Sequence, residues 1–147
     1  MRITQESDYA LRIVTALALK GNTVDAGTLS AETSVTPRFT LKILHKLVRV
    51  GIVSSFKGAN GGSRLSCSPE ELTMKDVIEA IEGPILIARC LHSHEDCTQS
   101  GINKTDCLYH HIFHQVGVQV AETFSAIRIA DVISGMTKKT TDREDER

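Results

Sequence analysis

The sequence predicts a mainly α protein with one small β-hairpin and a long helix near its carboxyl end. Its 147 residues are enough for one domain with a short extension. Four Phe, two Tyr and no Trp leave a core of aliphatic side chains, which suits packed helices better than a β-sandwich. A Thr-Pro helix start, followed by a glycine-rich hairpin directly after that helix, completes the prediction.

Two helices are predicted at the start of the chain. From Asp8 to Lys20 apolar residues recur at the helical period, with Ser7 or Asp8 available as the cap and Gly21 as the stop. Residues 26–33 form a shorter and less regular helical segment before a turn.

Thr36-Pro37 opens a third helix, because a hydroxyl can cap the first turn and proline lacks an N–H where none is needed. This helix is expected to run to Val50 and to end at Gly51. Its buried stripe is expected to consist of Leu41, Leu44, Leu47 and Val48. Basic side chains spaced by three or four residues line the other side: Arg38, Lys42, His45, Lys46 and Arg49.

A predicted hairpin over residues 52–66 follows this helix. Its short strands alternate apolar and polar residues, and the loop 58–62 holds three glycines, which tolerate positive φ. Lys57 and Arg64 flank the tip, where they can reach phosphates or the minor groove. A short helix, a tight turn, a basic helix and such a hairpin together predict a winged helix-turn-helix, a fold that reads DNA.

The net charge of −1 combines two halves of opposite sign. Residues 1–66 hold nine Lys or Arg against four acids, a net charge of +5, whereas residues 67–147 hold eight against fourteen, a net charge of −6. A basic first half is typical of a module that meets a polyanion such as double-stranded DNA. The apolar run 13–19 is far shorter than the roughly 20 residues that span a bilayer, so no membrane partner is expected.

Three of the four cysteines and five of the six histidines fall between residues 90 and 114: Cys90, Cys97, Cys107, His92, His94, His110, His111 and His114. No secretory signal is recognised, so a reducing cytoplasm is expected, where clustered thiols more often bind metal or sense redox state than form disulfides. Three thiolates suit an iron-sulfur cluster. Zinc, a thiol switch and plain packing remain alternatives. Cys67 stands apart and is expected to be a small buried residue.

Two further helices and a tail complete the prediction. One helix is expected over residues 75–82, beginning near Thr73. From Cys107 an apolar stripe returns at helical spacing for about five turns, as far as Ile127. A helix this long needs a partner surface, and the same helix of a second copy is the simplest one, so a homodimer is expected. A smaller element at 130–134 and a disordered tail at 136–147 follow.

Several motifs in combination resemble the Rrf-two-type family of bacterial regulators. They are Met1-Arg2-Ile3-Thr4, Asp8-Tyr9-Ala10-Leu11-Arg12, Lys42-Ile43-Leu44 with Leu47, Gly51-Ile52-Val53, and the wing Lys57-Gly58-Ala59-Asn60-Gly61-Gly62-Ser63-Arg64-Leu65. The resemblance covers residues 1–135 and implies a homodimeric winged-helix transcription factor, many of whose relatives hold an iron-sulfur cluster in a three-cysteine loop. Two features depart from the family pattern: the nine residues between Cys97 and Cys107, and Ser63, where an aromatic is common.

The resemblance supports two candidates for the fourth cluster ligand. His110 follows Cys107 by three residues, as in members with a Cys-x-x-His motif, and on a helix the two share a face. Asp8 matches the carboxylate that other members supply from the partner subunit. The expected cofactor is therefore a 2Fe-2S or 4Fe-4S cluster held by Cys90, Cys97, Cys107 and His110, with Asp8 as the alternative fourth ligand.

The sequence thus predicts a cytoplasmic, dimeric repressor or activator of transcription that senses iron, redox or nitric oxide status. Its parts are a DNA-binding domain (1–83), a cysteine loop (84–106), a dimerisation helix with a short terminal helix (107–135) and the tail. A pseudo-palindromic operator is expected to contact Thr36, Arg38, Phe39, Lys42, Lys57, Asn60 and Arg64. A cluster-free or zinc-binding regulator controlled by thiol oxidation or a protein partner is the alternative. A small redox enzyme is disfavoured, because no catalytic motif is recognised.

Overall fold

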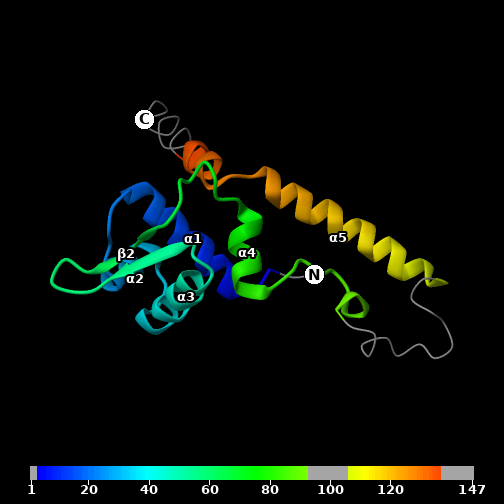
Figure 1. Cartoon of the computed structure of the whole chain (residues 1–147), viewed down its shortest axis with the longest axis horizontal. Helices are drawn as coiled ribbons and strands as arrows, with labels where there is room; N and C mark the ends of the chain where they lie inside the picture. The colour runs from blue at the N-terminus through cyan, green and yellow to red at the C-terminus, as the bar shows by residue number, and fades with distance from the viewer. Residues whose placement is uncertain (1–2, 93–105, 137–147) are drawn as a thin grey trace, which may run out of the picture.

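The computed structural model describes residues 3–92 and 106–136 (Figure 1). Its elements are, in order, α1 (Gln5–Lys20), α2 (Ala26–Thr33), α3 (Pro37–Arg49), β1 (Val53–Phe56), β2 (Gly62–Leu65), α4 (Met74–Glu82), the short 3-10 helix η1 (Arg89–Leu91) and α5 (Leu108–Ala126). Residues 129–136 are helical as well. The mainly α fold with a small β-wing is confirmed. Most of the predicted cysteine loop and all but the first residue of the predicted disordered tail lie outside the described residues.

α1 lies at the centre of the helical body, in contact with α2, α3 and α4. Its core residues Ala10, Ile13, Val14 and Leu17 are at most 1% exposed. Aliphatic side chains of the other three helices close around them: Leu29, Ile43, Leu44, Leu47 and Val77. Each fully buried side chain of this size contributes roughly 1.5–3 kcal/mol to folding. The core is therefore aliphatic, as the composition predicts.

α1 begins earlier than the predicted start at Asp8. Its N-cap is Thr4, whose side-chain oxygen accepts a hydrogen bond from the Ser7 N–H at 3.3 Å. Ser7, which is fully buried, and Asp8 both lie within the first turn, so neither is the cap. Gly21 ends the helix as predicted, with a φ of 65° that favours glycine.

The buried face of α3 differs from the predicted stripe. Thr40 and Ile43 are fully buried, whereas Leu41 is 48% exposed and Val48 is 37% exposed. Thr40 can enter the core because its hydroxyl donates a hydrogen bond to the Val35 carbonyl oxygen at 3.4 Å. The core-facing side of α3 therefore consists of Thr40, Ile43, Leu44 and Leu47, and Leu41 and Val48 lie outside the core.

The wing, residues 53–65, is an antiparallel pair of β1 and β2 that docks on the helical body through Val24. Val24 and Ser63 exchange two backbone hydrogen bonds, of 2.9 and 2.8 Å. Gly62 has a φ of 152°, and a Cβ on this residue would lie 2.5 Å from the Val24 carbonyl oxygen. Glycine at position 62 therefore permits the close approach that fixes the wing to the body.

α5 extends away from the helical body as one long helix and touches α4 and η1 (Figure 1). After it the chain returns to the start of α4. The Met74 N–H donates to the Ile127 carbonyl oxygen and the Ile129 N–H to the Leu72 carbonyl oxygen, both at 2.9 Å. Ile129 is 1% exposed, so the carboxyl end of α5 is anchored in the core. Neither α5 nor any other described helix is long and apolar enough to span a membrane.

Candidate nucleic-acid interface and cysteine loop

α3 presents a row of basic side chains to solvent. Its exposed basic residues recur every three or four positions and are Arg38, Lys42, His45 and Arg49. Lys46 is half-buried and takes part in a different contact, described below. Thr36 is exposed at the start of the helix, and its hydroxyl does not accept the N-cap hydrogen bond predicted for it. We call the exposed side of α3, with Arg38, Leu41, Lys42, His45 and Arg49, the basic face.

Phe39 lies on the flank of the basic face, between α3 and α1. Its ring meets that of Tyr9 edge-on, with the centroids 6.0 Å apart. The Lys42 ammonium lies 5.8 Å from the Phe39 centroid, within the range of a cation–π contact. The ring is 42% exposed, so it both packs on α1 and lies beside Lys42 at the surface.

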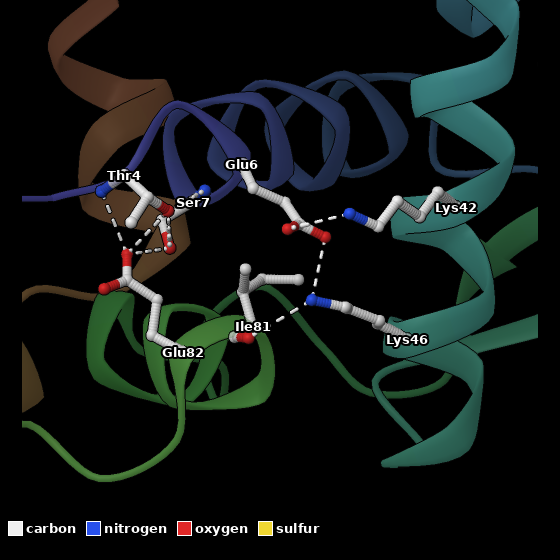
Figure 2. Close-up of polar contacts among 7 residues, drawn as sticks. All are labelled: Thr4, Glu6, Ser7, Lys42, Lys46, Ile81 and Glu82. Atoms are coloured by element: carbon white, nitrogen blue, oxygen red, sulfur yellow. Dashed lines mark hydrogen bonds and ion pairs between the residues drawn. The ribbon is translucent and has the colours of Figure 1, made fainter.

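One carboxylate of α1, that of Glu6, bridges two lysines of α3 (Figure 2). Its oxygens lie 3.2 Å from Lys42 Nζ and 2.8 Å from Lys46 Nζ. Burial raises the pKa of the Glu6 carboxyl, but the hydrogen bonds and charges of Lys46 and Lys42 outweigh burial, and the pKa lies below its ordinary value of 4.5. Lys46 Nζ also donates to the Ile81 carbonyl oxygen at 3.4 Å. Lys46 thus joins α1, α3 and α4.

A second carboxylate, that of Glu82, holds the end of α4 to the start of α1 (Figure 2). It accepts hydrogen bonds of 3.0 Å from both the N–H and the hydroxyl of Thr4, and another from the Ser7 hydroxyl. Burial raises the pKa of Glu82, yet these hydrogen bonds lower it more, so the net shift is downward. α4 is therefore fixed to α1 at the point where the chain enters the cysteine loop.

The predicted DNA-contacting residues of the wing, Lys57, Asn60 and Arg64, are all exposed. The Arg64 guanidinium carbon lies 4.6 Å from the centroid of the Phe56 ring, a contact that restrains the arginine on the surface of the hairpin. β1 packs against α3, and the wing extends from the body next to this helix (Figure 1). Basic side chains of the wing and of α3 thus belong to adjoining elements.

Two of the three predicted cluster thiols belong to described residues. Cys90 lies in η1, Cys107 is the N-cap residue of α5, and both are free thiols of intermediate exposure. η1 and α5 are in contact, and His110 lies in the first turn of α5. Cys97 lies outside the described residues, and within the described part no three His, Cys, Asp or Glu side chains gather as a metal site. Burial, then the charges of Glu71 and Asp76, raise the pKa of the half-buried thiol of Cys67.

Asp8, the alternative ligand, has a local ionic partner. Its carboxylate lies 2.7 Å from the Arg12 guanidinium, one turn along α1. Both residues line an open groove of about 460 Å³ that also borders α2 and the helix at 129–136. A role of Asp8 as a ligand supplied to a second copy stays a prediction.

A winged helix-turn-helix whose recognition helix, here α3, carries exposed basic side chains is the architecture of DNA-binding transcriptional regulators. A family model matches residues 3–135, that of Rrf2, described as an iron-dependent transcriptional regulator. The chain belongs to the Rrf2 family, which is the Rrf-two-type family that its motifs resemble. Proteins of this family are transcriptional regulators and not enzymes.

Individual relatives agree with this assignment. The chain is 30% identical over 127 residues to a candidate HTH-type transcriptional regulator of Aquifex aeolicus, across 86% of this chain and 87% of the relative. It is 25% identical over 136 residues to the regulator NsrR of Bacillus licheniformis, across 90% of this chain and 92% of NsrR. The solved structure of CymR, the global cysteine regulator of B. subtilis, is similar with a TM-score of 0.73 at 20% identity, covering 91% and 97% of the two chains.

Proposed function

We propose that two copies of this chain bind one pseudo-palindromic DNA operator in the cytoplasm through α3 and the wing, and that an iron-sulfur cluster in the cysteine loop controls this binding. The observation that carries the DNA part is the basic face of α3, whose cations are exposed on the helix that a winged helix-turn-helix inserts into the major groove. A transcriptional regulator of a bacterial family acts in the cytoplasm, where its operator is.

In this proposal the two elements have different tasks. The first turns of α3, with Thr36, Arg38, Phe39 and Lys42, lie nearest the base edges, since recognition helices read bases through their amino-terminal half. The wing residues Lys57, Asn60 and Arg64 contact phosphates or the minor groove and so add affinity for any sequence.

Salt dependence tests the wing assignment directly. Each phosphate contact that is lost lowers the slope of log affinity against log salt by about 0.9. We expect Lys57→Gln and Arg64→Gln each to reduce the slope by about one and to weaken binding to all duplexes alike. Lys75→Gln on α4, whose lysine pairs with Glu79 at 3.8 Å, is the matched control and should leave the slope unchanged. Unchanged slopes in both wing variants contradict the proposal.

The exposed stripe of α5 supports the homodimer. Tyr109, Ile112, Phe113 and Val116 follow the i, i+3, i+4, i+7 pattern and are 70%, 42%, 38% and 41% exposed. Apolar residues that recur on one exposed side of a helix favour packing against a second helix of the same kind. Two copies joined through α5 would present two wings and two basic faces to successive turns of one duplex.

The cysteine loop supports the cluster through its donor set. Thiolates completed by one imidazole or carboxylate are accepted by iron-sulfur clusters, and Cys90 and Cys107 lie on elements that touch. Cys90, Cys97 and Cys107 would hold the cluster, with His110 or Asp8 as the fourth ligand. When bound, the cluster supplies a group whose presence depends on iron and redox state. Cys90 of η1 and Cys107 at the start of α5 would hold it; α5 contacts α4, and α4 is in turn tied to α3 through Lys46.

Colour after anaerobic purification tests the cluster. We expect visible absorbance with matching iron and sulfide, and its loss in Cys90→Ala. Cys67→Ala is the matched control, because that thiol packs against the core and should leave the absorbance intact. A colourless wild-type protein, with zinc or without metal, contradicts the cluster.

A second candidate is a cluster-free or zinc-binding regulator that responds to thiol oxidation or to a protein partner. It is favoured by the likeness of the fold to that of CymR, the global cysteine regulator of B. subtilis. Oxidant-dependent DNA binding in a colourless protein is the result that distinguishes it.

A further inference from the structure

Leu41 occupies an unusual place for an aliphatic side chain. It is 48% exposed although it belongs to a helix whose other side forms the core. Its neighbours along the basic face are Arg38 one turn before, Lys42 next to it and His45 one turn after, all exposed. Leaving such a side chain in water forgoes part of the roughly 1.5–3 kcal/mol that its burial would contribute, so a contact outside the chain is the natural place for its apolar surface.

The basic side chains around Leu41 indicate which kind of partner can cover it. A protein partner that covered Leu41 would also have to desolvate the basic side chains around it. The exposed stripe of a second α5, with Tyr109, Ile112, Phe113 and Val116, carries no acidic residue with which to pair them, and the single acid of that helix, Glu122, lies outside the stripe. The major groove of DNA offers what this surface lacks, phosphates along its edges and one apolar group within it, the C5-methyl of thymine. We propose that Leu41 reads a thymine by contact with its methyl group and is a specificity-determining residue of the regulator. The inference rests on the proposed DNA-binding role of α3.

Position along the helix supports this assignment. Leu41 is the fifth residue of α3, within the amino-terminal half that enters the groove. Val48 is also exposed, at 37%, but it follows seven residues later, about 10 Å along the axis. The two residues thus form a matched pair, apolar and exposed on one helix, of which Leu41 alone lies where base edges are expected.

Removal of a single methyl group tests the inference. A binding sequence is first selected from a random duplex library with the full-length protein purified anaerobically. Each thymine of the selected half-site is then replaced in turn by deoxyuridine, which lacks only the C5-methyl. We expect one thymine per half-site at which this change weakens wild-type binding about three- to fivefold, the value for one buried methyl group. In Leu41→Ala the same change should have no effect, while Val48→Ala should retain the wild-type response.

Several results would overturn the inference. They are a Leu41→Ala variant that keeps the wild-type deoxyuridine profile, a half-site in which no thymine is sensitive, and a selection that yields no preferred sequence. Leu41→Ala should also keep the oligomeric state of the wild type, and dissociation of the dimer would show that Leu41 contacts a second copy instead. Failure of the proposed function is distinguishable, because it appears as unchanged salt slopes in the wing variants.

Discussion

The Glu6 carboxylate lies 2.8 Å from the Lys46 ammonium, and the same ammonium donates to the last turn of α4 at the Ile81 carbonyl oxygen. Lys42, one turn before Lys46 on the same helix, shares the carboxylate but leaves 54% of its side chain exposed. Two lysines that look equivalent in the sequence therefore have different environments. Lys46 supports the arrangement of three helices, and Lys42 remains accessible to a ligand of the basic face.

This difference predicts opposite effects for two equivalent substitutions. Lys46→Met should lower the free energy of unfolding by about 1 kcal/mol, since it removes a half-buried ion pair and a helix-end contact. It should leave the salt slope of DNA binding unchanged. Lys42→Met should have the smaller effect on stability but should weaken binding to the selected duplex, since it removes an exposed cation from the basic face. Urea unfolding and fluorescence anisotropy measure the two quantities, and a reversed pattern would contradict the roles given to these lysines.

The two carboxylates of Figure 2 predict an acid-dependent loss of stability. The pKa values of Glu6 and Glu82 lie below the ordinary 4.5 in the folded protein. Their ionised forms therefore contribute stability that is complete above that value and is lost as the pH falls through the lowered pKa.

Glu6→Gln and Glu82→Gln should consequently differ from the wild type by a constant amount from neutral pH down to the ordinary value of 4.5, and the difference should shrink as the pH is lowered from there to about 3. Gln115→Ala, an exposed neutral change on α5, controls for the general effect of acid. A stability difference that stays constant below 4.5 as well would show that neither carboxylate is held in its ionised form.

Gly62 predicts a selective defect of the wing. A Cβ at this position would meet the Val24 carbonyl oxygen at 2.5 Å and cannot be accommodated by rotation of a side chain. Gly62→Ala should break the hydrogen bonds between Val24 and Ser63 and lower the affinity for every duplex, because the wing cations lose their position. Gly135→Ala is the control, as its Cβ would meet nothing within 4 Å. Equal DNA affinity of the two variants would mean that docking of the wing is dispensable.

Much of the helical body could be predicted because its signals are local. Pro37, Gly21 and the periodic aliphatic residues act within one or two turns, and the observed helices follow them. The buried side of α3 could not be predicted, since it depends on a hydroxyl at Thr40 whose partner, the Val35 carbonyl oxygen, is supplied by the preceding turn. A stripe chosen by hydrophobicity alone prefers Leu41 to Thr40 and is wrong for that reason.

The candidate site, like the helical body, could be predicted from the sequence only in part. Exposure of the basic residues at 38, 42, 45 and 49 follows from helical spacing and is observed. The link from α3 to α4 through Glu6 and Lys46 joins residues that are far apart in the sequence, so only the fold reveals it. The cluster ligands remain a prediction, because Cys97 lies outside the described residues.

The apolar stripe of α5 predicts dimerisation through this helix. Phe113→Asp places a charge among Tyr109, Ile112 and Val116 and should convert the dimer to monomers in sedimentation experiments. Gln119→Asp introduces the same charge at an exposed polar position of α5 and should leave the dimer intact. DNA binding should weaken in the monomeric variant, since the two half-sites of an operator are then bound by separate DNA-binding domains that are no longer linked. A dimer that persists in Phe113→Asp would place the interface elsewhere.

Control of DNA binding by the cysteine loop is tested most directly by measuring the affinity of one selected duplex for the cluster-loaded and the cluster-free protein at a fixed salt concentration. The two forms should differ in affinity by about fivefold or more, the lower range of ordinary allosteric coupling. The affinity of Cys90→Ala should match that of the cluster-free wild type, whether the variant is prepared under cluster-loading or under cluster-free conditions. Identical affinities of loaded and emptied wild-type protein would contradict the account.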